Sequence, residues 1–126
     1  FPTGPRFPDM HEAYNKGLIE LANSIAKEKD IRLVHGVYMG VSGPTFETPA
    51  EYRAFYRLGA DAVGMSTVPE VIVACHSGIK VFGMSIITDL GLEGTAVEVS
   101  HEEVQIAANK AQPLMTEIMR EMIRRS

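Results

Sequence analysis

The sequence is poor in cysteine, in net positive charge and in long apolar runs. Its 126 residues contain one cysteine, Cys75, and no tryptophan. One cysteine cannot form an intrachain disulfide, so we expect a reducing, cytoplasmic location. The formal net charge of −4 argues against nucleic acid or an anionic membrane as partner, since both favour a basic surface. No apolar run approaches the roughly 18 residues of a membrane span, and we expect neither a membrane segment nor a signal peptide.

The remaining composition is that of a globular domain. Apolar residues make up 45% of the chain and charged residues 22%, both ordinary values. The four histidines, at positions 11, 35, 76 and 101, lack the spacing of metal ligands, and we expect no metal. The chain begins with Phe1 rather than Met, which we interpret as a sign of processing, cleavage or truncation.

Residues 42–51 predict a crossing from a strand to a helix. They follow the apolar run Ile31–Val41, which predicts a buried strand. Gly43-Pro44 supplies the turn. Thr48-Pro49-Ala50-Glu51 predicts a helix start, with Thr at the N-cap and Glu three residues later. In open α/β sheets ligands usually bind at the carboxyl ends of strands, so we expect the binding site here.

Glu47 is the one charged residue of this turn before the helix cap. Phe46 precedes it directly, and Tyr38 lies upstream on the expected strand. An aromatic ring beside a single carboxylate suits a flat heterocycle, which can stack on the ring and donate an N–H to the carboxylate. The alternative is an ordinary strand–turn–helix with a solvated Glu47.

The other expected elements alternate between helices and strands, which is typical of the α/β class. The expected helices are Asp9–Lys29 with Asp9 as N-cap, Pro49–Leu58 before Gly59, a helix opened by Ser66–Glu70 and closed by Cys75–Ser77, and a final helix capped by Ser100 with an apolar stripe from Val104 to Met122. The further strands are Ala62–Met65 and Val81–Ile87, and Leu90–Val99 is expected to be a mobile loop.

Four motifs together resemble one enzyme family. They are Gly36-Val37-Tyr38, residues 43–48, residues 59–70 and Ile87-Thr88. The sequence resembles the trimeric, phosphate-dependent purine nucleoside phosphorylases of the 6-oxopurine type over nearly its whole length. The resemblance implies an α/β fold with a mixed, largely parallel sheet flanked by helices and incomplete at its amino-terminal side. Residues 1–126 would form the carboxyl-terminal portion of a single domain in a homotrimer.

The resemblance also implies roles for individual residues. It assigns catalysis to Glu47, Asp89 and His101, substrate binding to Tyr38, Phe46, Val63, Met65, Thr88 and Phe7, and phosphate binding to Ser66. Phe7 would reach into the ribose site of a neighbouring subunit. From the residues alone, Phe7 could equally staple a helix start, Ser66 could serve a helix N-terminus without a ligand, and His101 could be a bystander.

Glu47 and Asp89 point to different purines. A carboxylate at Glu47 accepts a hydrogen bond from N1–H of a 6-oxopurine, a proton that adenine lacks. Asp89 departs from the resembled family, which usually carries Asn there. Aspartate at this place is familiar in methylthioadenosine phosphorylases, but those enzymes lack the Phe-Glu-Thr pattern. We expect the two carboxylates to lie close together, so that both do not ionise freely and Asp89 gains proton affinity and donates to O6.

The resemblance implies phosphate-dependent cleavage of purine nucleosides, with inosine and guanosine favoured, to a free purine and ribose 1-phosphate. Inorganic phosphate would be the co-substrate, with no cofactor. The main phosphate loop of the family is not in this sequence. We therefore expect these 126 residues to carry a base-and-ribose half-site and to be inactive or nearly so alone. A methylthioadenosine-type phosphorylase, a purine-binding module without turnover and a purely structural fragment remain the alternatives.

Overall fold

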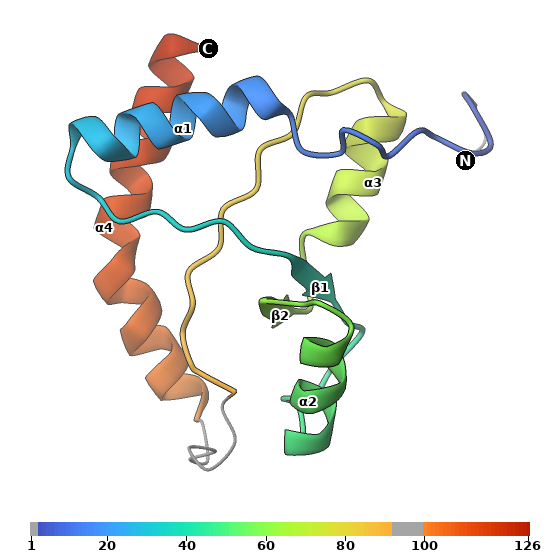
Figure 1. Ribbon diagram of the computed structural model, residues 1–126, viewed down its shortest axis with the longest axis vertical. Helices are drawn as coiled ribbons and strands as arrows, with labels where there is room; N and C mark the ends of the chain where they lie inside the picture. The colour runs from blue at the N-terminus through green and yellow to red at the C-terminus, as the bar shows by residue number, and fades with distance from the viewer. Residues whose placement is uncertain (1–2, 92–99) are drawn as a thin grey trace. The chain divides into compact units, whose positions relative to one another are not determined.

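The computed structural model describes residues 3–91 and 100–126, and its ribbon is drawn in Figure 1. It divides into two units. The first unit comprises the residues up to Leu33, Ser66–Met84 and Glu117–Ser126, and the second comprises Val34–Met65 and Ser85–Thr116. Most of the loop expected over residues 90–99 lies outside the described residues.

The first unit contains α1 (Lys16–Glu28), α3 (Val68–His76) and the end of α4 (His101–Arg125). The prediction that the first helix begins after Asp9 is wrong. The Asn15 side chain accepts a hydrogen bond from the Leu18 amide at 3.1 Å and caps α1 there. Asp9 instead accepts a bond from the His11 amide at 2.9 Å. Such a local side-chain bond offers the backbone an alternative to the helix.

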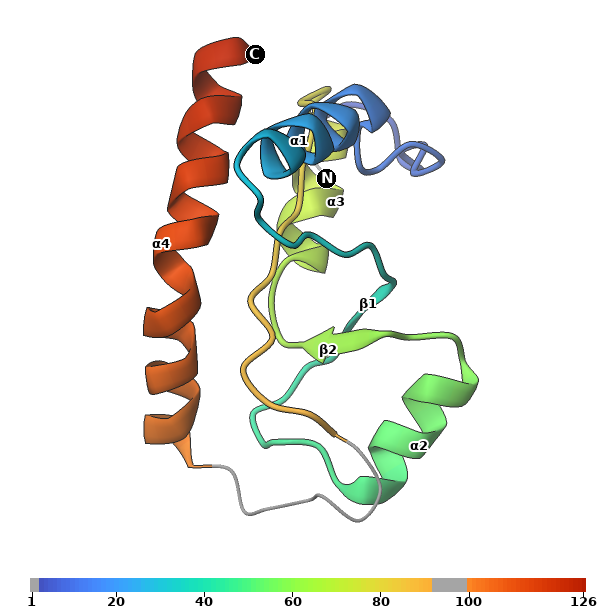
Figure 2. The same ribbon diagram turned by 60° about the vertical axis from the view of Figure 1, so that its left-hand side comes forward.

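The core of this unit lies where α1 meets the last turns of α4, as Figure 2 shows. Ile25 of α1 and Ile118 of α4 are almost fully buried. The buried and half-buried positions of α4 follow the predicted apolar stripe. Two ion pairs, Lys29–Glu117 at 2.7 Å and Arg125–Glu28 at 2.9 Å, lie beside this contact. Exposed pairs of this kind contribute little, so burial of apolar surface holds the two helices together.

The second unit is built around a strand–helix–strand segment. Strands β1 (Tyr38–Gly40) and β2 (Ala62–Gly64) pair in parallel, with Met39 opposite Val63. Helix α2 (Pro49–Arg57) lies between them in sequence, because parallel neighbours need a crossover connection. The Asp61 carboxylate accepts a hydrogen bond from the Val37 amide at 2.8 Å. This bond links the residue before β1 to the residue before β2. The predicted α/β class, with a parallel sheet and helices, is confirmed.

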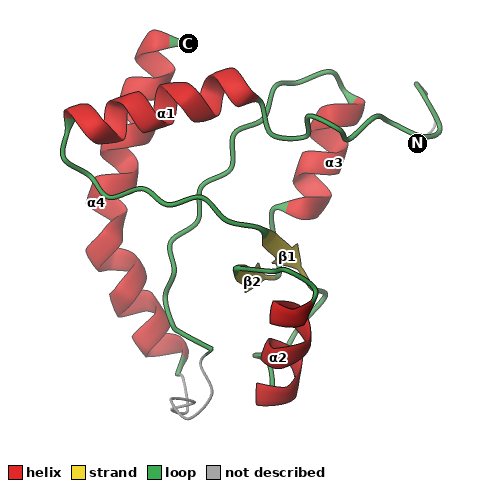
Figure 3. Ribbon diagram, in the orientation of Figure 1, coloured by secondary structure: helices red, strands yellow, loops and turns green. Residues whose placement is uncertain are grey.

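Two of the predicted strands are wrong in extent or absent. The run Ile31–Val41 forms a strand only over Tyr38–Gly40, and Val34 is 70% exposed. Residues 81–87 run as a loop in Figure 3. The Val81 carbonyl accepts from the Asn15 amide at 2.8 Å rather than from a strand. An extended segment becomes a strand only where a neighbouring backbone completes its ladder, and the described residues supply none here.

Both predicted capping boxes are confirmed. The Thr48 hydroxyl accepts from the Glu51 amide at 3.2 Å, and the Glu51 carboxylate accepts from the Thr48 amide at 2.6 Å. Ser100 and Glu103 make the same pair of bonds at the start of α4. Helix α2 ends at Arg57, one residue before the predicted Leu58, whose side chain is 75% exposed.

Helix α3 begins close to the predicted place. Its N-cap residue is Thr67, which has a φ of 75° and makes no side-chain cap bond. Pro69 lies in the first turn, as expected. Within residues 3–91 and 100–126, no helix is both long and apolar enough to cross a bilayer.

Replacing Ile118 by Ala tests the α1–α4 core. Because Ile118 is 1% exposed, we expect the substitution to lower the free energy of unfolding by about 2–5 kcal/mol. Ile123 on the same helix is 74% exposed, and Ile123→Ala should change it by no more than about 0.5 kcal/mol. Urea unfolding followed by circular dichroism measures both. Equal losses for the two variants would contradict the described core.

Candidate functional site

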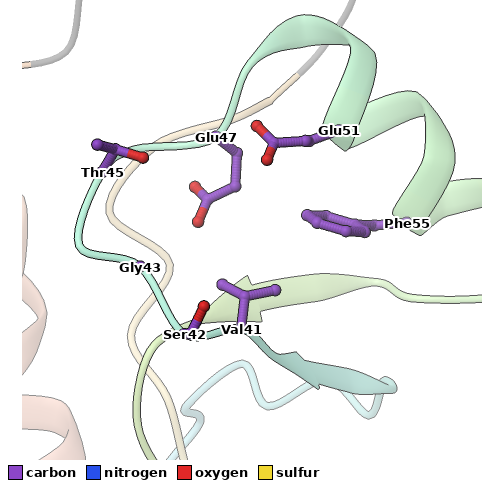
Figure 4. A pocket seen from close by; sticks show the side chains of 7 residues that line it. All are labelled: Val41, Ser42, Gly43, Thr45, Glu47, Glu51 and Phe55. Atoms are coloured by element: carbon purple, nitrogen blue, oxygen red, sulfur yellow. The ribbon is translucent and has the colours of Figure 1, made fainter.

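A hollow lies between the end of β1 and the start of α2, where the sequence predicts the binding site. Figure 4 shows its lining, with the Glu47 side chain extending into it and the Phe55 ring facing it from α2. The lining residues are Val41, Ser42, Gly43, Thr45, Glu47, Glu51 and Phe55. Of the residues predicted to bind substrate or act in catalysis, only Glu47 lines it. Sequence reasoning did not predict Phe55 as a lining residue.

The start of α2 places Glu47 opposite Tyr52. Glu47 directly precedes the N-cap Thr48, and Tyr52 is the fourth residue of the helix. Residues at these two positions commonly face each other at helix starts, usually as an apolar pair. Here the Tyr52 hydroxyl donates to Oε2 of Glu47 at 3.3 Å. A polar pair therefore occupies the staple position.

Asp89 joins this pair from a distant part of the chain. The Tyr52 hydroxyl also lies 3.4 Å from Oδ2 of Asp89. The neighbouring Thr88 hydroxyl donates to Oδ1 of Asp89 at 3.0 Å. The expectation that Glu47 and Asp89 lie close together is thus met, with a phenol between them. Tyr52 itself is a residue that sequence reasoning missed, although the staple spacing to Glu47 was a signal for it.

The surroundings keep Tyr52 protonated. Partial burial, then the negative charges of Asp89 and Glu47, raise the pKa of the Tyr52 phenol from 10.0 to about 12. Each effect disfavours a phenolate. At neutral pH the hydroxyl therefore remains a hydrogen-bond donor facing two carboxylates. A base that presents polar groups along one edge would meet this cluster of acceptors and one neutral donor.

Other predicted substrate residues of the second unit lie on or beside the two strands. The Tyr38 hydroxyl lies against Gly64, where a Cβ would overlap it. The Met65 side chain lies in the same way against Gly43, whose φ of +66° also favours glycine. Val63 is half-buried on β2. Phe46 is 51% exposed and does not line the hollow, so its stacking role stays a prediction.

Three further predicted residues do not touch this cluster in any described contact. His101 is exposed at the first position of α4. Ser66 belongs to the first unit, where its hydroxyl lies 3.2 Å from that of Thr67. Phe7, also in the first unit, is 81% exposed, with the Arg6 guanidinium 5.3 Å from its ring centre. Their roles stay predictions. The part of the chain that the structure describes contains no group of three or more His, Cys, Asp or Glu arranged to hold a metal.

The chain matches a family model described as "Phosphorylase superfamily" over residues 1–124. Purine nucleoside phosphorylase 1 of Bacillus subtilis (strain 168) is 50% identical over 107 residues, which are 85% of this chain and 40% of that protein. A crystal structure of isoform 2 of purine nucleoside phosphorylase from Schistosoma mansoni, in complex with cytosine and ribose-1-phosphate, is 47% identical with a TM-score of 0.91. The match covers 95% of this chain and 44% of that one.

Purine nucleoside phosphorylase of Schistosoma mansoni in complex with inosine is 40% identical, with a TM-score of 0.88, over 95% of this chain and 44% of that one. Complexes of the Schistosoma protein with guanosine and with adenosine match equally well. The chain spans less than half the length of these relatives. Since the family model covers almost all of its residues, the chain belongs to the phosphorylase superfamily, and its relatives there are purine nucleoside phosphorylases.

Proposed function

We propose that this chain is the base-and-ribose part of a purine nucleoside phosphorylase that cleaves inosine and guanosine with phosphate. One observation carries the proposal. The carboxylates of Glu47 and Asp89 meet around the Tyr52 hydroxyl beside a hollow at the strand–helix crossing. Family membership supports the same reaction, and relatives with inosine, guanosine and adenosine bound support a purine nucleoside as substrate. The choice of inosine and guanosine rests on the Glu47 carboxylate.

The reaction moves an electron pair onto the base. A phosphate oxygen bonds to the anomeric carbon of ribose, the bond from that carbon to N9 breaks, and the purine keeps the bonding electrons. The proton that hydrogen phosphate loses on forming the ester passes, directly or through water, to a ring nitrogen of the base, and neutral purine and ribose 1-phosphate are released. Catalysis therefore depends on positioning phosphate and on hydrogen bonds to the base. Inorganic phosphate is the co-substrate, and the reaction uses no metal or organic cofactor.

Glu47 selects the tautomer of the base. Its carboxylate is an acceptor only, and it can take the N1–H of hypoxanthine or guanine. Adenine presents a lone pair at N1, which a carboxylate repels. Asp89 faces the same edge and serves N7 or the group at C6. Ser66, whose backbone leads into the N-terminus of α3, contributes to phosphate binding.

Tyr38, Val63, Met65, Thr88 and Phe46 surround the nucleoside in this proposal, and His101 contacts the sugar. The protein is a cytoplasmic homotrimer in which Phe7 reaches a neighbouring ribose site. The 81% exposure of Phe7 is consistent with a donated ring, and the single cysteine suits a reducing compartment.

The second candidate is a methylthioadenosine-type phosphorylase. Asp89 favours it, because an aspartate accepts from an exocyclic amine. Glu47 opposes it, because its carboxylate lies near Asp89 at the same edge of the site. There it would repel the unprotonated N1 of a 6-aminopurine.

Phosphate-dependent release of hypoxanthine tests the proposal. We expect the protein that contains this chain to release hypoxanthine from inosine at about 1 to 1000 per second, and only when phosphate is present. Turnover of methylthioadenosine without turnover of inosine would favour the second candidate. Binding of hypoxanthine with no turnover of either nucleoside would indicate a binding module and contradict the proposal.

Replacing Glu47 by Gln tests tautomer selection. The variant loses a charged acceptor for N1–H, so kcat/KM for inosine should fall roughly 10- to 100-fold, or about 1.5–3 kcal/mol. Glu70, in the first turn of α3, belongs to the other unit, and Glu70→Gln serves as the matched control with little expected change. A Glu47→Gln enzyme as active as the wild type would exclude the proposed role.

Replacing Asp89 by Asn tests whether this residue binds N7 or the group at C6 of a 6-oxopurine. The amide is a permanent donor to O6 or acceptor from N7–H, so kcat/KM for inosine should be kept or improved. Activity on adenosine should stay low, because Glu47 still faces an unprotonated N1. Steady-state kinetics with both nucleosides measure the outcome. Loss of a substantial adenosine activity present in the wild type would refute the substrate assignment and favour the second candidate.

A further inference from the structure

Within the described residues, the Tyr52 side chain contacts both candidate base-binding carboxylates. Its hydroxyl lies 3.3 Å from Glu47 and 3.4 Å from Asp89. A phenol carries a single proton, whereas each carboxylate is an acceptor. Both distances exceed the about 2.7–2.8 Å typical of O–H···O bonds. The hydroxyl therefore makes no short hydrogen bond, and it can donate its one proton to either carboxylate.

The position of the Tyr52 ring is fixed from two sides. At the fourth residue of α2 it faces Glu47 as a consequence of the helix start. On another side the ring lies against Gly91, where an added Cβ would overlap the Cδ1 and Cε1 atoms of the ring. The ring therefore contacts the Gly91 backbone while its hydroxyl contacts the two carboxylates.

We propose that Tyr52 is a positioning residue, whose hydroxyl holds the Glu47 and Asp89 carboxylates side by side at the base edge and so sets the preference for 6-oxopurines. This inference rests on the proposed function. Among the described residues, the charged groups that raise the pKa of Tyr52 are Asp89 and Glu47, and the Thr88 hydroxyl donates a hydrogen bond to Asp89. Its pKa is raised to about 12, so the hydroxyl keeps its proton and remains a hydrogen-bond donor across the neutral pH range.

The preference follows from the direction in which Glu47 is held. Two like charges repel, and without a donor between them they turn toward solvent. With the hydroxyl in place, Glu47 stays at the N1 edge, where it binds N1–H of hypoxanthine and repels N1 of adenine. Removing the hydroxyl weakens the bond to inosine and also relieves the repulsion of adenosine. Both changes lower the discrimination between the two nucleosides.

Replacing Tyr52 by Phe removes the hydroxyl and keeps the ring. We expect the ratio of kcat/KM for inosine to that for adenosine to fall roughly 10-fold, as for loss of a bond to a charged group. Tyr56→Phe is the matched control, because Tyr56 lies one turn further along α2 and is 78% exposed. Gly91→Ala, which keeps the hydroxyl but displaces the ring, should lower the ratio in the same direction. An unchanged ratio in Tyr52→Phe would overturn the proposal.

A measurement without substrate separates this inference from the proposed function. In carbon-13 NMR spectra at neutral pH, the side-chain carboxyl resonances of Glu47 and Asp89 should both shift in Tyr52→Phe and stay in place in Tyr56→Phe. Resonances that do not respond to Tyr52→Phe would reject the positioning role. If the wild type releases no hypoxanthine from inosine, the proposed function fails, while the resonances still decide whether the hydroxyl couples the carboxylates.

Discussion

The capping box between Thr48 and Glu51 is the interaction on which the candidate site depends. Its two reciprocal bonds fix where α2 begins, and that start places residues 47 and 52 opposite each other. At many helix starts this pair is an apolar staple. Here it is a carboxylate and a phenol, so the same geometry that starts the helix also builds a hydrogen-bonded pair at the end of β1. The Glu47 side chain is thereby positioned by the start of a helix rather than by a long loop.

Three glycines allow side chains near the site to lie against the backbone. Gly64 and Gly43 leave space for the side chains of Tyr38 and Met65, and Gly91 leaves space for the ring of Tyr52. A methyl group at any of the three would overlap a neighbouring side chain. These glycines are therefore explained by what lies against them, and only Gly43 of the three also requires a positive φ.

Features with local causes were predictable from the sequence, and features with distant causes were not. The capping boxes of Thr48 and Ser100 lie within four residues each and were predicted. The helix start at Asn15 was missed because Asp9 has the same capping chemistry, and periodicity cannot choose between them. The strand over residues 81–87 was wrong because a ladder needs a partner that local pattern does not reveal. Proximity of Asp89 to Glu47 was predicted because each was expected to follow a strand whose carboxyl end faces the same side of the sheet, and it holds although residues 81–87 form no strand. The contact between Tyr52 and Asp89 joins residues 37 positions apart, and no local sequence pattern predicts it.

A crystal structure of the protein with hypoxanthine bound tests the central claim most directly, namely that the Glu47–Tyr52–Asp89 cluster recognises the edge of a 6-oxopurine. The account predicts the base in the hollow beside α2, with N1 about 2.7–2.9 Å from a Glu47 oxygen and the Tyr52 hydroxyl still between the two carboxylates. A base bound elsewhere, or one bound in the hollow with Glu47 turned to solvent, would contradict it.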